Sequence, residues 1–152
     1  MAQASVWQRT KQLFFLLLLV FTIGYAGSGL MTPSTVAWYN SLTKSPLTPP
    51  DFIFPIVWTA LLFLQAIGAF LVWGKASPRW FVIQLMLNML WSFCFFYLHQ
   101  PISSFIISIL FSGALAANTY IFGKAHKIAG LCIIPTFLWS LFAIYLNAYI
   151  IY

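Results

Sequence analysis

The chain alternates between long apolar runs and short polar connections. Five runs, at about 13–31, 52–73, 80–97, 102–122 and 128–151, are long enough to cross a hydrocarbon core of about 30 Å as an α-helix that rises about 1.5 Å per residue. The last three connections are short, and short connections join antiparallel neighbours. The pattern therefore predicts an all-α membrane protein, a five-transmembrane-helix up-down bundle that forms a single domain over residues 1–152.

The composition agrees with a protein whose solvent is lipid. Of the 152 residues, 62% are hydrophobic and 5% are charged, whereas a soluble domain has about 25% charged residues. The mean hydropathy is +0.95. Because so few charges could not solvate a folded monomer in water, we expect an integral membrane protein that is surrounded by a lipid bilayer.

The charged residues indicate an orientation in that membrane. The formal net charge is +6, yet the bases are spread singly between apolar runs, so no nucleic-acid partner is expected. If all five runs span, one side of the membrane has Lys44 and the only acid, Asp51. The other side has six bases, namely Arg9, Lys11, Lys75, Arg79, Lys124 and Lys127. By the positive-inside rule, the N-terminus is predicted to be cytoplasmic.

The N-terminal segment gives an expectation for the membrane itself. It is short and lacks the Arg- and Ser-rich character of a transit peptide, which favours a bacterial cell membrane. The alternative is a bacterial or mitochondrial outer membrane. The first apolar run follows two bases as a signal peptide would, but it is longer than the apolar region of a signal peptide, so we expect it to be retained.

The one long connection, at 32–48, is a candidate lid. It contains Trp38 and Tyr39, and its prolines restrict the backbone. The alternative interpretation is a belt of aromatic side chains at the membrane interface. At the end of this connection, Thr48 is predicted to be the N-cap of the second helix and Pro49 its first helical residue.

Several classes of chemistry are excluded by the residue types present. The middle of each predicted span lacks Asp, Glu, Lys, Arg and His, which a proton pump or a charged ion pore normally requires. A single carboxylate does not support acid–base catalysis by paired carboxyl groups. The two cysteines and two histidines show no ligand spacing, so no metal site is expected.

Amide and indole side chains remain as candidates for function. They recur at steps of three and four, which gives each set one helical face: Gln84, Asn88, Trp91 and Phe95 in the third run, and Trp139, Ala143 and Asn147 in the fifth. Unbonded amides are costly in hydrocarbon, so both faces should point inward. The amides either join helices by hydrogen bonds or, with Trp58 as a further wall, line a pocket for a flat, apolar, aromatic ligand.

Small residues recur at a spacing of four in the fourth run. The pairs are Ser112 with Ala116 and Gly113 with Ala117. Such pairs let two helices approach closely, either within one chain or in a homodimer.

Four sequence motifs follow one another along the chain. They are WYNSLTKSPLTPP at 38–50, FPIVW at 54–58, LNMLWSFCFF at 87–96 and PTFLWSLFAIYLN at 135–147. Together they resemble the motifs of the translocator protein family, whose members are the tryptophan-rich sensory proteins of bacteria and the mitochondrial peripheral benzodiazepine receptor. The resemblance covers nearly the whole chain after about residue 20.

The resemblance implies an integral membrane receptor or sensor for porphyrins, such as protoporphyrin IX and heme-type tetrapyrroles, and also for sterols or benzodiazepine-type drugs. The porphyrin is a ligand, and no cofactor is required. Carried over by motif, the ligand-binding residues are Tyr39, Trp58, Asn88, Trp91, Trp139 and Ala143. One alternative is a light-dependent porphyrin-degrading enzyme, in which Trp58 and Trp139 would be catalytic. The other is a transporter of tetrapyrroles or sterols.

The chain departs from the family pattern at three places. Leu47 stands where the lid motif usually has a tryptophan, which removes one aromatic wall. Tyr149, near the end of the fifth run, lacks the following base that the proposed cholesterol motif requires. Family dimers are thought to pack through the third helix, and this run has no pair of small residues four apart.

Overall fold

The computed structural model describes residues 5–152, apart from the side chains of Gly27 and Ser28. Within this part of the chain, five helices are long and apolar enough to cross a membrane. They are α1 (Val6–Tyr25), α3 (Ile53–Leu71), α4 (Arg79–Ser92) with its π-helical continuation η2 (Phe93–Tyr97), α5 (Pro101–Ala125) and α6 (Lys127–Ile151). The predicted fold class, an all-α bundle of five membrane-spanning helices, is confirmed.

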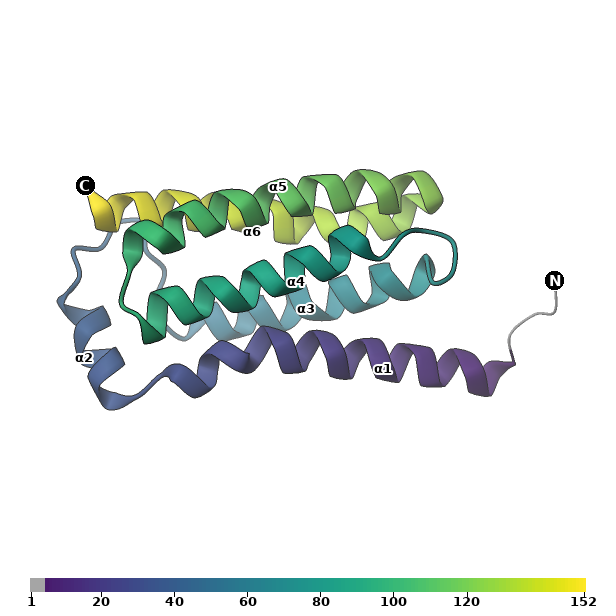
Figure 1. Cartoon of the computed structure of the whole chain (residues 1–152), viewed down its shortest axis with the longest axis horizontal. Coiled ribbons are helices and arrows are strands. Elements are labelled where there is room, and N and C mark those ends of the chain that lie inside the picture. The colour runs from purple at the N-terminus through teal and green to yellow at the C-terminus, as the bar shows by residue number, and fades with distance from the viewer. Residues whose placement is uncertain (1–4) are drawn as a thin grey trace.

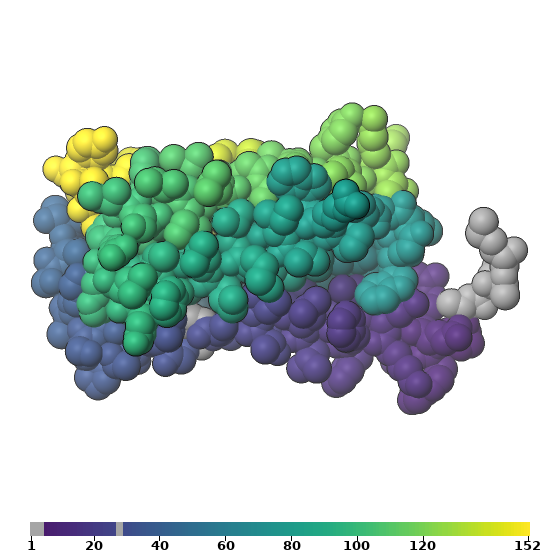
Figure 2. Space-filling model, in the orientation of Figure 1, coloured from purple at the N-terminus to yellow at the C-terminus, as the bar shows by residue number. Residues whose placement is uncertain are grey.

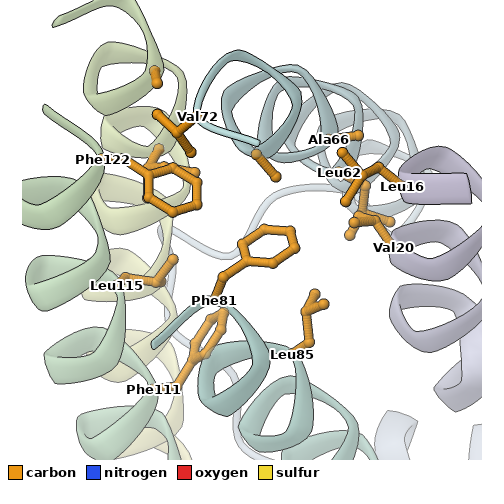
Figure 3. Close-up of a cluster of buried hydrophobic side chains, with 13 residues drawn as sticks. Leu16, Val20, Leu62, Ala66, Val72, Phe81, Leu85, Phe111, Leu115 and Phe122 are labelled. Carbon is orange, nitrogen blue, oxygen red and sulfur yellow. The ribbon is translucent and has the colours of Figure 1, made fainter. Parts of the chain in front are cut away.

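The five helices form a closed ring whose order differs from their order in the chain. Contacts along their length join α1 to α3, α3 to α6, α6 to α5, α5 to α4, and α4 back to α1. The helices α3 and α4 follow one another in sequence, yet they lie on opposite sides of the interior (Figure 3). Side chains of α3 and α4 can therefore meet only across the centre of the bundle.

The two ends of the bundle differ in charge. The beginning of α1, the α3–α4 connection and the α5–α6 turn lie at one end, and the lid and the C-terminus lie at the other (Figure 1). We call the first the basic end, because all six bases predicted to share a side belong to its segments. Figure 2 shows that the side chains of α1, α4 and α5 together cover one long face between these ends.

Apolar side chains from the ring of helices fill the interior. Val20 of α1, Ala66 of α3 and Leu115 of α5 are fully buried, and Phe81 of α4 projects between them (Figure 3). Many large apolar side chains on the outer faces are exposed, as expected of a surface that contacts lipid. Because lipid tails are as apolar as leucine, close packing holds such helices together in place of the hydrophobic effect.

Glycine makes the α5–α6 turn very tight. The two helices are separated only by His126, and a Cβ atom added to Gly130 would lie 2.7 Å from the Cα of Gly123. The predicted runs end at about 122 and begin again at about 128, and both helices continue into the residues between them. Close approach at these two glycines is what allows so short a turn.

The predicted N-cap of the second span, Thr48, is wrong, although the span itself begins close to the predicted residue 52. The helix α3 begins at Ile53, after the N-cap residue Phe52, which makes no side-chain capping bond. Thr48 instead closes a turn, with its N–H bonded to the Ser45 carbonyl at 2.9 Å. Pro49 is disfavoured as the first helical residue, because it precedes Pro50, and a residue before proline is disfavoured in the α-region.

Candidate functional site

The lid contains a helix that the sequence pattern did not predict. The helix α2 (Pro33–Ser41) follows the short 3-10 segment η1 (Ala26–Leu30), and its N-cap Thr32 accepts a hydrogen bond from the Thr35 N–H at 3.2 Å. Pro33 occupies the first turn, where its missing N–H costs nothing. The connection at 32–48 is thus a folded segment that holds its aromatic side chains in fixed positions.

Two long-range hydrogen bonds hold the lid against the bundle. The hydroxyl of Thr35, which is buried, bonds the carbonyl oxygen of Phe96 in η2 at 3.3 Å. The hydroxyls of Ser45 and Tyr145, on the lid and α6, lie 2.8 Å apart. The lid is therefore fastened to both sides of the ring, at the end of α4 and near the end of α6.

A first group of rings lies directly beneath α2. We call it the lid cluster; its members are Trp38, Tyr39, Trp91, Phe95 and Phe96. Phe95 is its centre: its ring lies 5.3 Å from Trp38, 6.3 Å from Tyr39 and 5.0 Å from Trp91, and it is stacked on Trp91. The predicted site residues Tyr39 and Trp91 are thus brought together through a phenylalanine.

A second group of rings lies between α3 and α6. We call it the α3–α6 cluster; it consists of a row of ring contacts through Phe54, Trp139, Phe142 and Tyr145, and of a separate pair, Trp58 of α3 with Phe111 of α5. The Trp139 ring lies 6.0 Å from Phe54, and Trp58 is one turn further along α3, 6.5 Å from Phe111. Among the described residues, no ring contact joins the two clusters directly. Both clusters nevertheless contact the lid. Trp38 and Tyr39 of the first cluster belong to the lid itself, and Tyr145 of the second cluster is hydrogen-bonded to Ser45 of the lid.

The two asparagines predicted to face inward differ in their bonding. With its amide oriented so that the oxygen faces the donors, Asn147 accepts hydrogen bonds from the Trp91 indole N–H at 3.1 Å and from the Phe105 backbone N–H at 3.2 Å. It therefore joins α6 to α4 and α5. Asn88, only 7% exposed, makes no side-chain hydrogen bond to any residue that the structure describes. Unbonded buried amides are rare in native proteins, so Asn88 is a candidate for ligand contact.

A chain of hydrogen bonds crosses the interior further from the lid. Thr136 Oγ1 accepts from Gln65 Nε2 at 3.3 Å, Gln65 Oε1 accepts from Gln84 Nε2 at 2.8 Å, and Gln84 Oε1 accepts from Asn118 Nδ2 at 3.3 Å. We call these four buried residues the polar relay. They come from α6, α3, α4 and α5, so the relay ties four of the five spanning helices together.

The sequence predicted the inward direction of Gln84 but overlooked Asn118. Its signal was the same, an amide within an apolar run. For Ala143 and Leu47, the structure gives a position and an exposure but no specific side-chain contact among the described residues. Ala143 is half-buried on α6 one turn beyond Trp139, and Leu47 is 65% exposed at the lid surface.

The electrostatics of the lid are set by three residues. The ammonium of Lys44 lies 3.7 Å from the centre of the Tyr39 ring, a cation–π contact. Burial raises the pKa of the Tyr39 phenol above its ordinary value, and the negative charge of Asp51 raises it further. Tyr39 is therefore neutral at physiological pH. Among the described residues, no group of three His, Cys, Asp or Glu side chains could hold a metal ion.

Comparison with known proteins places this arrangement in a family. The model of the TspO/MBR family matches residues 15–152. The tryptophan-rich protein TspO of Chlorobaculum tepidum is 33% identical over 85% of this chain and 87% of its own length. That of Archaeoglobus fulgidus is 35% identical over 86% and 89%. The human translocator protein is 27% identical over 81% of this chain and 78% of its own length.

Proposed function

The chain belongs to the TspO/MBR family, and from this premise we propose that it is a membrane receptor or sensor that binds porphyrins between the lid and helices α3, α4 and α6. The ligand class is protoporphyrin IX and heme-type tetrapyrroles. The two aromatic clusters supply flat apolar walls on both sides of the interior, and the lid bridges them. A planar macrocycle is the kind of ligand that such walls stack against.

The observation that carries this proposal is the unbonded amide of Asn88. It lies one turn from Trp91 on the buried face of α4, and its amide makes no hydrogen bond to the described residues. A ligand with polar groups on its rim, such as the carboxylates and ring nitrogens of a porphyrin, would satisfy it. Asn147, by contrast, already has protein partners.

A titration with protoporphyrin IX, followed by quenching of tryptophan fluorescence, tests the proposal. Asn88→Ala should weaken binding about fivefold, the equivalent of one hydrogen bond of about 1 kcal/mol, and leave thermal stability without ligand unchanged. The matched variant Asn147→Ala should lower thermal stability without ligand, because Trp91 and Phe105 lose an acceptor. Unsaturable binding by the parent protein, or unchanged affinity in Asn88→Ala, would refute the site.

Light-dependent degradation of the bound porphyrin is a second candidate. The Trp139 ring contacts Phe54, and Trp58 follows Phe54 by one turn of α3, so an excited ligand beside them would have two oxidisable indoles within reach. Illumination of the protein with protoporphyrin IX should then bleach the pigment faster than free porphyrin, and Trp58→Phe or Trp139→Phe should abolish the difference. Equal bleaching with and without protein eliminates the enzymatic candidate and leaves the receptor.

We further propose that the basic end faces the cytoplasm and that the membrane is a bacterial cell membrane. The six bases at that end, against Lys44 and Asp51 at the other, support this orientation. Labelling of single cysteines at Ser77 and Thr43 with an impermeant reagent in intact cells tests it. The residue at 43 alone should react; labelling at 77 alone would reverse the orientation.

A further inference from the structure

Two neighbouring cavities lie at the basic end, far from the proposed porphyrin site. The larger, about 290 Å³, is partly open and is lined mainly by apolar residues of four helices, including Leu16, Ala69, Phe81 and Phe122. The smaller, about 130 Å³, lies between α1 and the end of α3 and is bordered by Arg9, Gln12 and Lys75, among others. One is suited to a hydrocarbon group and the other to a polar, negatively charged one.

Trp73 borders both cavities. Its side chain is 43% exposed, so the wall that the two cavities share reaches the surface of the bundle. The indole packs edge-on against Phe15 of α1, with ring centres 6.2 Å apart. Tryptophan is enriched at membrane interfaces, where its ring contacts acyl chains and its N–H reaches the headgroups. The pair of cavities therefore lies at the depth where a lipid changes from tail to head.

The bases beside the smaller cavity lack an acidic partner in the protein. The guanidinium of Arg9 lies 4.9 Å from the centre of the Phe70 ring, which holds it at the edge of the cavity. The only acidic side chain of the chain, Asp51, follows the lid at the opposite end of the bundle. Arg9 and Lys75 therefore present positive charge that an external anion can neutralise, and arginine is well suited to phosphate oxygens.

The volume of the larger cavity restricts its occupant. An engineered apolar cavity of about 150 Å³ holds one benzene molecule, and pockets for drug-sized ligands begin at about 300 Å³. A cavity of about 290 Å³ accepts part of a hydrocarbon chain and is too small for a whole tetrapyrrole.

We propose that these two cavities form a binding site for one anionic glycerophospholipid of the adjacent leaflet. Part of an acyl chain occupies the larger cavity, the phosphate is bound by Arg9 and Lys75, and Trp73 lies at the boundary between them. The site requires no porphyrin and stands independently of the function proposed above.

Native mass spectrometry of the detergent-solubilised protein tests the proposal by counting bound lipids. Titration with dioleoylphosphatidylglycerol should give one tightly retained lipid per chain, and dioleoylphosphatidylcholine should be retained at least tenfold more weakly. Each base near an anionic lipid surface increases the binding affinity about fivefold. The double variant Arg9→Gln/Lys75→Gln should therefore weaken retention of the anionic lipid roughly 25-fold. Equal retention of the two lipids would overturn the proposal.

Matched controls separate the site from the overall charge. Lys124→Gln/Lys127→Gln removes the same charge at the same end of the bundle but outside both cavities, and should change retention less than twofold. Filling the larger cavity by Ala69→Leu, or by Ala76→Leu if the first variant unfolds, should weaken retention. The proposal would be overturned if the control variant lost as much retention as Arg9→Gln/Lys75→Gln, or if filling the larger cavity had no effect. Full competition by glycerol 3-phosphate, which has no acyl chain, would also overturn it.

Discussion

Gln84→Met tests whether the polar relay holds the bundle together. Gln84 is fully buried in α4 and is one of the two central members of the relay, since it donates to Gln65 and accepts from Asn118. Methionine has a similar length and a flexible apolar side chain, so the substitution removes both hydrogen bonds with little loss of packing. Any loss of stability then reports on polar contacts.

The structure sets the expected size of this loss. Hydrogen bonds between membrane helices are worth about 0.6 kcal/mol on average and at most about 1.7 kcal/mol, so two of them contribute about 1–3 kcal/mol. The substitution also leaves Gln65 Oε1 and Asn118 Nδ2 without partners, and Asn118 Oδ1 already has none in the structure. We therefore expect the free energy of unfolding to fall by about 1–3 kcal/mol, toward the upper end of this range.

Equilibrium unfolding in mixed micelles with increasing dodecyl sulfate, followed by helical circular dichroism, measures this loss. In the double variant Gln65→Met/Gln84→Met the unpaired oxygen of Gln65 is gone, so the cost should be smaller than the sum of the two single variants. Met89→Leu, on the exposed face of α4, serves as a control and should change stability by less than about 0.5 kcal/mol. A Gln84→Met protein as stable as its parent, or strict additivity in the double variant, would show that the relay does not stabilise the bundle.

Two further predictions concern packing and charge. Gly130→Ala should cost about 1–3 kcal/mol of unfolding free energy, because its Cβ would lie 2.7 Å from the Cα of Gly123; Gly113→Ala, with nothing within 4 Å, is the control and should be neutral or stabilising. Because the pKa of Tyr39 is raised above about 10, its contribution to lid stability is present below that pH and is lost as the pH rises through the higher folded value. In a spectroscopic titration of tyrosinate, Asp51→Asn should lower the pKa of Tyr39 only in part, because burial is the larger cause of the shift. A fully normal Tyr39 pKa in the variant would show instead that the charge of Asp51 is the main cause.

The number of spanning helices and their alternation could be read from the sequence, because each span is a nearly uninterrupted apolar run bounded by bases or prolines. The order of the helices around the ring could not. An apolar run shows that a helix lies in lipid, and says little about which of its faces meets which neighbour. The amides are the exception, because Gln65 and Gln84 must point inward. Their hydrogen bond across the interior shows that the inward faces of α3 and α4 are opposite each other.

The candidate site was predictable in its residue types but only partly in its bonding. Asn88 and Asn147 are both amides on inward faces of apolar runs, and neither pattern nor spacing distinguishes them. Their roles diverge in the structure because Asn147 faces the indole N–H of Trp91 and the backbone of α5, whereas the Asn88 side chain makes no hydrogen bond to the described residues. The lid helix α2 was missed because it is short and lies outside the apolar runs, although Thr32 followed by Pro33 is a readable helix start.

The position of the polar relay favours a receptor over a conduit through the bundle. Along α4, Gln84 lies between Phe81, which borders the larger cavity at the basic end, and Asn88, which lies toward the lid. A porphyrin moving through the interior from one end to the other would have to separate the relay. Three hydrogen bonds would be lost, at about 2–5 kcal/mol in total, along with the close packing of four helices. A ligand bound at the lid end, as proposed above, would leave the relay intact.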